Sequence, residues 1–148
     1  MKKNSYVIDA NVFLEYVYNR KLSYKSKKIL QDAILQRIKI FVPSLFFDEI
    51  TEVFCGNLND CKKIEEHLRY LENLAKEQVL NIVVPDSVIR MKAIEIARTG
   101  NKKNGYPELA DSLYHAVAIL NKSIFITNDI KHIVKVKKFG YIQELQSY

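Results

Sequence analysis

The sequence lacks the features that would mark a membrane, secreted or zinc-binding protein. No apolar run approaches the roughly 20 residues that a membrane-spanning helix needs. The N-terminal Met1-Lys2-Lys3 leads into a strand-like segment instead of the apolar stretch of a signal peptide. Cys55 and Cys61 lie near a Gly56-Asn57 turn without a CxxC pair or a histidine cluster, which argues against zinc. We therefore expect a cytoplasmic protein without membrane contact, its cysteines reduced and packed.

No internal repeat or low-complexity segment divides the chain. Its 148 residues, 48% of them hydrophobic, suit one domain with a sizeable core. We expect a single domain over residues 1–148.

Short apolar runs alternate with amphipathic stretches. The strand-like runs are residues 5–8, 38–42, 79–84, 123–126 and a last one near 140–142. Helical spacing begins at residue 12 and recurs over residues 24–36, 45–55, 61–75, 87–99 and 107–120, with a helical turn at 129–134. Strands that alternate with helices form right-handed βαβ units. The pattern predicts an α/β fold, a three-layer α/β/α sandwich with a mainly parallel central sheet.

Four acidic residues recur at the ends of these elements. Asp9 follows the apolar run Tyr6-Val7-Ile8, and Asp129 follows a second such run through Thr127. Glu49 and Asp111 lie on helices whose N-termini would face the same sheet edge, where open α/β sheets bind ligands. Each acid also has an ordinary explanation. Asp9 and Asp129 could cap helices, Asp111 near a helix N-terminus is favoured by the helix dipole, and Glu49 could be an ordinary solvated residue.

A cluster of these four acids would carry a cost in charge repulsion. Like charges close together disfavour joint ionisation, so the group is tolerated if some of the acids are protonated or if a divalent cation neutralises them. Oxygen ligands favour Mg²⁺ or Mn²⁺, which can activate water against a phosphodiester. The net charge of +6 suits attraction of a polyanion, although an excess of lysine is often only a solvated face. Metal-dependent phosphodiester hydrolysis is the resulting hypothesis.

Four segments in order resemble the PIN domain family. They are Tyr6-Val-Ile-Asp-Ala-Asn-Val-Phe-Leu14, Val42-Pro-Ser-Leu-Phe-Phe-Asp-Glu-Ile50, Glu108-Leu-Ala-Asp-Ser-Leu-Tyr-His-Ala-Val-Ala118 and Phe125-Ile-Thr-Asn-Asp129. The resemblance implies an α/β/α sandwich and a Mg²⁺- or Mn²⁺-dependent endoribonuclease. It implies that the catalytic, metal-binding acids are Asp9, Glu49, Asp111 and Asp129, and that the residues orienting ligands or water are Asn11 and Thr127.

Among PIN domains, a chain of this size is similar to the VapC-like toxin ribonucleases of type II toxin-antitoxin modules. This similarity implies an RNA substrate, a homodimer and a cognate antitoxin protein that blocks the pocket. The chain departs from the family in having His132 where an aromatic residue often follows the last acid. A second departure is the lysine-rich loop before Asp111.

Further candidates and rival functions remain open. Lys102 and Lys103 are candidates for RNA phosphate contacts, and His115 for a proton carrier, although each also suits an ordinary surface or packed position. A haloacid-dehalogenase-like phosphatase would need a second aspartate where Asn11 stands, which argues against that class. A catalytically silent RNA-binding or protein-interaction module, or a housekeeping RNA-processing nuclease, would share the fold.

Overall fold

A parallel sheet forms the centre of the molecule. The computed structural model describes residues 3–57, 59–100, 102–103 and 105–148. Within these residues, all strand pairs of the five-stranded sheet are parallel, in the order β3-β2-β1-β4-β5. The strands are β1 (Asn4–Ile8), β2 (Ile38–Pro43), β3 (Leu80–Val83), β4 (Ile124–Thr127) and β5 (Ile142–Glu144).

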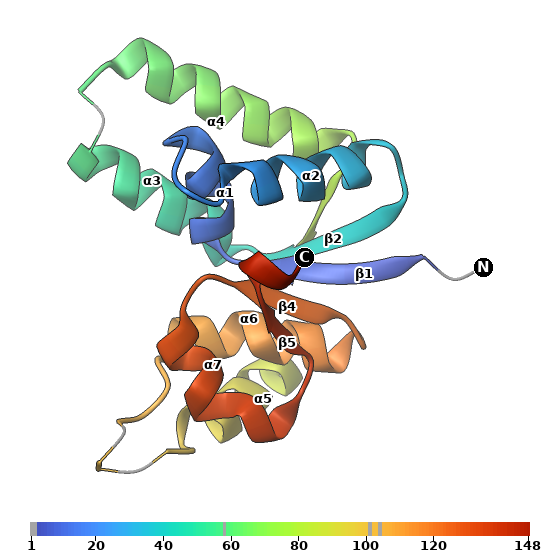
Figure 1. The fold of residues 1–148 in the computed structure, drawn as a ribbon, viewed down its shortest axis with the longest axis vertical. Helices are drawn as coiled ribbons and strands as arrows, with labels where there is room; N and C mark the ends of the chain where they lie inside the picture. The colour runs from blue at the N-terminus through green and yellow to red at the C-terminus, as the bar shows by residue number, and fades with distance from the viewer. Residues whose placement is uncertain (1–2, 58, 101, 104) are drawn as a thin grey trace.

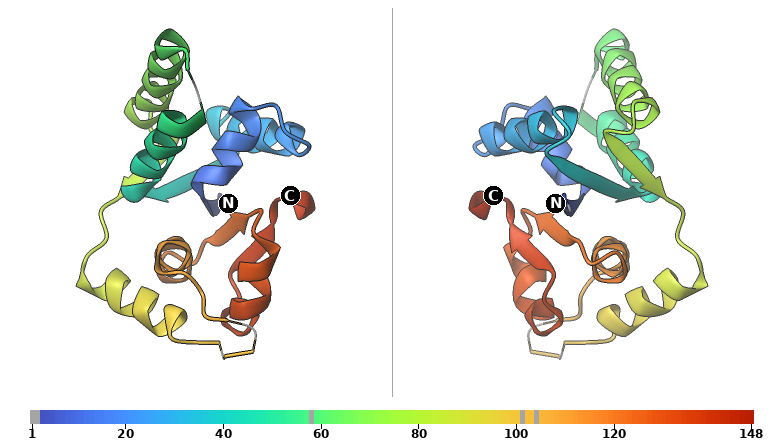
Figure 2. Two further views of the ribbon diagram at one scale, coloured as in Figure 1. Left: turned by 90° about the vertical axis from the view of Figure 1, so that its left-hand side faces the viewer. Right: turned by 90° about the vertical axis from the view of Figure 1, so that its right-hand side faces the viewer.

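Helices cover both faces of this sheet. One layer lies above it in Figure 1 and consists of α1 (Ala10–Val17), α2 (Ser23–Ile34), α3 (Leu45–Asn57) and α4 (Cys61–Lys76). The other lies below it and consists of α5 (Ser87–Ala97), α6 (Leu109–Leu120) and α7 (Ile130–Val136), with the short 3₁₀ helix η1 (Lys137–Phe139). The side views in Figure 2 show the same separation, so the predicted three-layer α/β/α sandwich is confirmed.

The central strands β1, β2 and β4 contribute most of the buried apolar residues of the sheet. Val7, Ile40 and Phe125 are fully buried, and Tyr114 of α6 stacks on Phe125 with ring centroids 5.7 Å apart. Parallel sheets require such two-sided burial, which explains near-continuous apolar runs instead of alternating ones. No helix of the described residues is long and apolar enough to cross a membrane.

Aspartates begin four of the helices. Asp9, Asp60, Asp86 and Asp129 are the N-caps of α1, α4, α5 and α7, and each accepts a hydrogen bond from a backbone N–H in the first turn. Such caps satisfy donors that the helix itself leaves unpaired. The capping explanation for Asp9 and Asp129 is therefore correct, and it leaves their remaining lone pairs available.

Two of three local expectations were wrong. The last strand begins at Ile142 instead of residue 140, because Gly140 and Tyr141 have positive φ angles of 66° and 53°, which an extended strand does not adopt. The helix α3 ends at Asn57, as expected from the Gly56-Asn57 pair. Cys55 and Cys61 are free but exposed, so they do not pack in the core.

The strand order places a switch point between β1 and β4. The chain leaves β1 toward β2 and β3 on one side and then crosses to β4 and β5 on the other. Ile8 pairs with Ile126, so the residues that follow, Asp9 and Thr127, emerge side by side at the carboxyl edge. Ligands in open α/β sheets bind in the crevice at such a point.

Candidate functional site

Asp9 is the buried centre of the candidate site. Only 3% of its surface is exposed. Its Oδ1 accepts a hydrogen bond from the Val12 N–H at 3.1 Å, and its Oδ2 accepts one from the Thr127 hydroxyl at 2.6 Å. Burial raises the pKa of Asp9 to about 6, although both hydrogen bonds act to lower it. The negative charges of Glu49 and Asp129 raise it further.

Thr127 connects two of the acids. While its hydroxyl donates to Asp9, its oxygen accepts the backbone N–H of Asp129 at 3.1 Å. Asp129 itself is exposed, and its Oδ1 accepts the His132 N–H at 3.1 Å. Thr127 therefore fixes the direction of the Asp9 carboxylate and the start of the turn that carries Asp129.

Glu49 is held by a residue that the sequence analysis did not select. The hydroxyl of Tyr114 donates to Glu49 Oε1 at 2.5 Å. Tyr114 is fully buried between α6 and the sheet, whereas Glu49 is half-buried at the start of α3. Burial raises the pKa of the Glu49 carboxyl, and the hydrogen bond from Tyr114 opposes that shift. Tyr114 is one turn from Asp111 on α6, but only the packing of α6 against the sheet brings it to Glu49.

Asp111 lies within the field of the other acids. Its pKa is raised to about 7, first by burial and then by the charges of Asp9, Asp129, Glu108 and Glu49. The four predicted acids thus share one electrostatic neighbourhood at the carboxyl edge of the sheet. Glu108, the residue before α6, adds a fifth negative charge that the sequence analysis passed over.

The other predicted residues differ in their exposure. Asn11 is exposed in the first turn of α1. Lys102 and Lys103 are exposed in the loop before α6. His115 is fully buried, and its Nε2 lies 2.7 Å from the Gly140 carbonyl oxygen, a position that suits packing and not proton transfer.

His132 occupies the place where an aromatic residue often follows the last acid. Its ring is buried and lies edge-on to Phe125, with centroids 6.2 Å apart. Burial lowers its pKa to about 4, so the ring is neutral at physiological pH. His132 thus packs as an aromatic side chain would. A buried ring still occupies this position, although the residue departs from the family pattern.

The donor set of the site suits a hard divalent cation. In the described part of the chain, no three histidine, cysteine or acidic side chains are gathered closely enough to hold a metal ion by themselves. Mg²⁺ usually needs only one or two carboxylates, with waters and substrate phosphates as its other ligands. The raised pKa values of Asp9 and Asp111 mark a place where negative charge lacks compensation. Oxygen donors with uncompensated charge fit Mg²⁺ or Mn²⁺.

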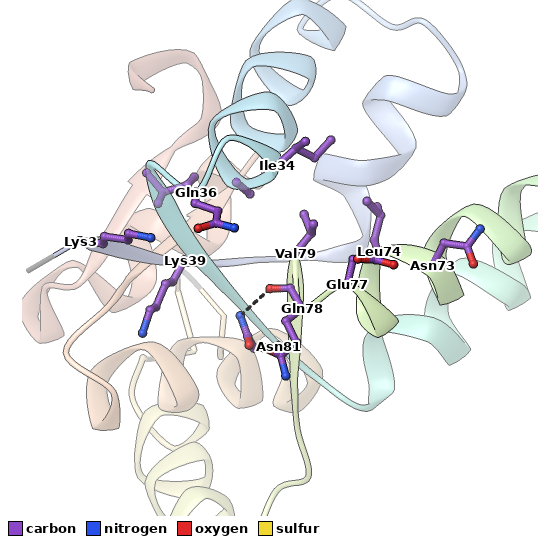
Figure 3. Close-up of a pocket in the computed structure, with 12 residues that line it drawn as sticks. Lys3, Ile34, Gln36, Lys39, Asn73, Leu74, Glu77, Gln78, Val79 and Asn81 are labelled. Atoms are coloured by element: carbon purple, nitrogen blue, oxygen red, sulfur yellow. Dashed lines mark hydrogen bonds between the residues drawn. The ribbon is translucent and has the colours of Figure 1, made fainter.

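A separate hollow of about 540 Å³ lies at the opposite edge of the sheet (Figure 3). Lys39 and Asn81 line it near the amino ends of β2 and β3, together with Gln36 and Gln78. None of the four acids lines this hollow. The chemistry of the acids at the carboxyl edge, and not the size of this hollow, identifies the candidate site.

Comparison with solved structures gives the same fold. The structure of VapBC-1 from nontypeable Haemophilus influenzae matches with a TM-score of 0.68 and 19% identity, covering 96% of this chain and 98% of that one. VapBC2 from Rickettsia felis, bound to a DNA fragment from its promoter, matches with a TM-score of 0.66 and 14% identity over 95% and 98% of the two chains. FitAB bound to the IR36 DNA fragment matches with a TM-score of 0.71 and 16% identity over 95% and 94%.

Comparison with curated proteins found no match. The family model of the PIN domain, in contrast, matches residues 6–138, which include all four predicted acids. The chain therefore belongs to the PIN domain family, whose members are generally nucleases.

Proposed function

We propose that this chain is a single-domain, Mg²⁺- or Mn²⁺-dependent endoribonuclease that acts as the toxin of a type II toxin-antitoxin module. Water adds to the phosphorus of an RNA phosphodiester and one ester P–O bond breaks. The observation that carries the proposal is the shared electrostatic neighbourhood of Asp9, Glu49, Asp111 and Asp129 at the switch point of the sheet.

The residues of the chain prepare this site in three ways. Asp9 would bind the cation directly, because its carboxylate is held between the Val12 N–H and the Thr127 hydroxyl. Glu49 would bind the cation from the start of α3, and the hydrogen bond from Tyr114 sets the direction of its carboxylate. Asp111 and Asp129 would complete the set from α6 and from the turn after β4. A divalent cation, when bound, lowers the pKa of water and neutralises charge on the phosphodiester.

The balance of charge supports a cation as a working part of the site. Burial disfavours the ionised forms of Asp9 and Asp111, and each acid raises the pKa of its neighbours. A bound cation reverses both effects, so divalent ions should bind more tightly as the pH rises through 6 and 7.

The structural relatives support a proposal about partners. Two of these structures are VapBC proteins, and another is described as a toxin-antitoxin complex from Klebsiella pneumoniae. By analogy, a cognate antitoxin would cover the acidic site of this chain, and the chain would form a homodimer in the cytoplasm.

An RNA cleavage assay tests the proposal. Purified protein is expected to cleave an unstructured RNA with Mg²⁺ or Mn²⁺, and not with EDTA. Asp9→Asn is expected to abolish cleavage without unfolding the protein, while Asp60→Asn, which alters an N-cap on α4, should cleave like wild type. Wild-type protein that binds RNA but never cleaves it would instead favour a catalytically silent module.

A further inference from the structure

A surface rich in lysine extends from the acidic site across α7 and η1. Residues 130–138 contain Lys131, Lys135, Lys137 and Lys138, and no acidic residue. Lys131 stands two residues after Asp129, and Lys135 lies one helical turn beyond Lys131 on the same face of α7. The row of lysines thus begins beside Asp129, one of the proposed catalytic acids, and continues along α7 and η1.

The loop before α6 joins this surface. Lys135 Nζ lies 3.4 Å from the Tyr106 carbonyl oxygen, which connects α7 to the loop. Gly100 and Gly105 have positive φ angles of 108° and 82°. A Cβ on Gly100 would meet the Gly105 carbonyl oxygen at 2.5 Å, so the two ends of the loop are in close contact. Lys102 and Lys103 stand between these two ends, at the tip of the loop, and both are exposed.

The charge of this surface is not neutralised within the chain. The ion pairs of the described residues involve Lys28, Arg37, Arg69 and Lys92, and none involves a lysine of α7, η1 or the loop tip. A lysine in the last turn of a helix is also favoured by the helix dipole, and this applies to Lys135 at the end of α7 and to Lys137 and Lys138 in η1. It does not explain Lys131 in the first turn of α7, or the lysines of the loop before α6.

An exposed aromatic ring lies within the same surface. Tyr106 is 54% exposed although it is a large side chain, and it stands between the loop lysines and the helix that carries Asp111. Cations that follow a phosphate backbone, combined with an aromatic ring on which a base can stack, are the usual elements of a single-strand binding surface.

We infer that the lysines of α7 and η1, with Lys102, Lys103 and Tyr106, bind the single-stranded RNA that extends from the acidic site. The inference rests on the proposed function and adds a substrate-binding surface to it. The lysines also counter the repulsion between RNA and the acids, because they raise the local concentration of the polyanion beside them.

Binding of a fluorescently labelled, unstructured RNA in EDTA separates this inference from catalysis. Two variants each remove two charges from the surface: Lys131→Gln with Lys138→Gln, and Lys102→Gln with Lys103→Gln. Each should lower the slope of log affinity against log salt by about 1.4, because a phosphate contact on a single strand contributes about 0.7. The control, Lys62→Gln with Lys63→Gln, removes the same charge from the exposed start of α4 and should keep the wild-type slope.

A second pair of variants tests the aromatic contact. Tyr106→Leu should weaken RNA binding about fivefold or more, as expected for loss of one base-stacking contact. Tyr24→Leu removes a tyrosine of similar exposure, 56%, from the opposite helical layer and should have no effect.

The outcomes separate the two proposals. Undetectable RNA binding by wild type, or α7 and loop variants that behave like the α4 control, would overturn the binding surface even if cleavage is observed. Wild-type RNA binding that depends on these lysines, without cleavage in Mg²⁺ or Mn²⁺, would support the surface and refute the nuclease. If the variants instead lose only a protein partner and keep RNA binding, the surface is not an RNA site.

Discussion

The buried carboxylate of Asp9 should destabilise the metal-free protein, and Asp9→Asn should relieve that cost. Burial raises the pKa of Asp9 from 3.8 to about 6. One pKa unit corresponds to about 1.4 kcal/mol, so the ionised form costs about 3 kcal/mol of folding free energy. Asparagine caps helices as well as aspartate does, and its side chain can still meet the Val12 N–H and the Thr127 hydroxyl. Allowing about 1 kcal/mol for a weaker hydrogen bond, Asp9→Asn should gain about 1–2 kcal/mol.

The gain should depend on pH with a defined sign. Between pH 4 and 6 the folded protein keeps a proton on Asp9 that the unfolded chain has lost, so the stability of wild type falls as the pH rises. Above pH 6 the loss is complete. Asp9→Asn should therefore be more stable than wild type at pH 8 and should lose this advantage near pH 4.

Thermal unfolding in EDTA, followed by circular dichroism, measures this difference. A gain of about 1–2 kcal/mol corresponds to about 2–8 °C in Tm for a chain of this size. Asp60→Asn, at an exposed N-cap, should change Tm little at either pH. A Tm for Asp9→Asn that equals that of wild type at pH 8, or a gain of equal size at both pH values, would refute the reasoning.

Other substitutions test the residues around the acids. Thr127→Val should destabilise the protein by about 1–3 kcal/mol in denaturant titrations, because it leaves a buried carboxylate oxygen of Asp9 without its donor. Tyr114→Phe should keep the fold but slow RNA cleavage severalfold. The pH profile of cleavage should move upward, because the hydrogen bond that lowers the pKa of Glu49 is lost. An unchanged pH profile would exclude a positioning role for Tyr114. His132→Phe should stabilise the protein below pH 6. The His132 ring has a pKa of about 4 in the folded protein, so as the pH falls it binds a proton in the unfolded chain first, and this favours unfolding. If the stability of His132→Phe falls with acid as much as that of wild type, this reasoning is wrong.

The sequence predicted the elements that local chemistry specifies. Apolar runs such as Tyr6-Val7-Ile8 must be buried strands, and aspartates that follow such strands begin the next helices. The position of Asp9 and Asp129 at one edge follows from parallel strand direction alone. The acidic neighbourhood was therefore accessible to sequence reasoning, although the catalytic roles within it stay a prediction.

Long-range contacts were not accessible in this way. Tyr114 and Glu49 are separated by 65 positions, and their hydrogen bond exists only because α6 packs against β2, the strand that leads into α3. Glu15 is a similar case: it is buried at 6% exposure because it accepts hydrogen bonds from the Leu22 N–H and the Asn128 side chain. The apolar patterns of the sequence carry no signal for such polar partners.

Cleavage of RNA by single-site variants tests the central claim most directly. In Mn²⁺ at pH 8, Asp9→Asn, Glu49→Gln, Asp111→Asn and Asp129→Asn should each lose nearly all cleavage while remaining folded, and Asp60→Asn should cleave like wild type. Retained cleavage in all four variants, or cleavage by wild type in EDTA, would contradict a metal-dependent site built from these acids.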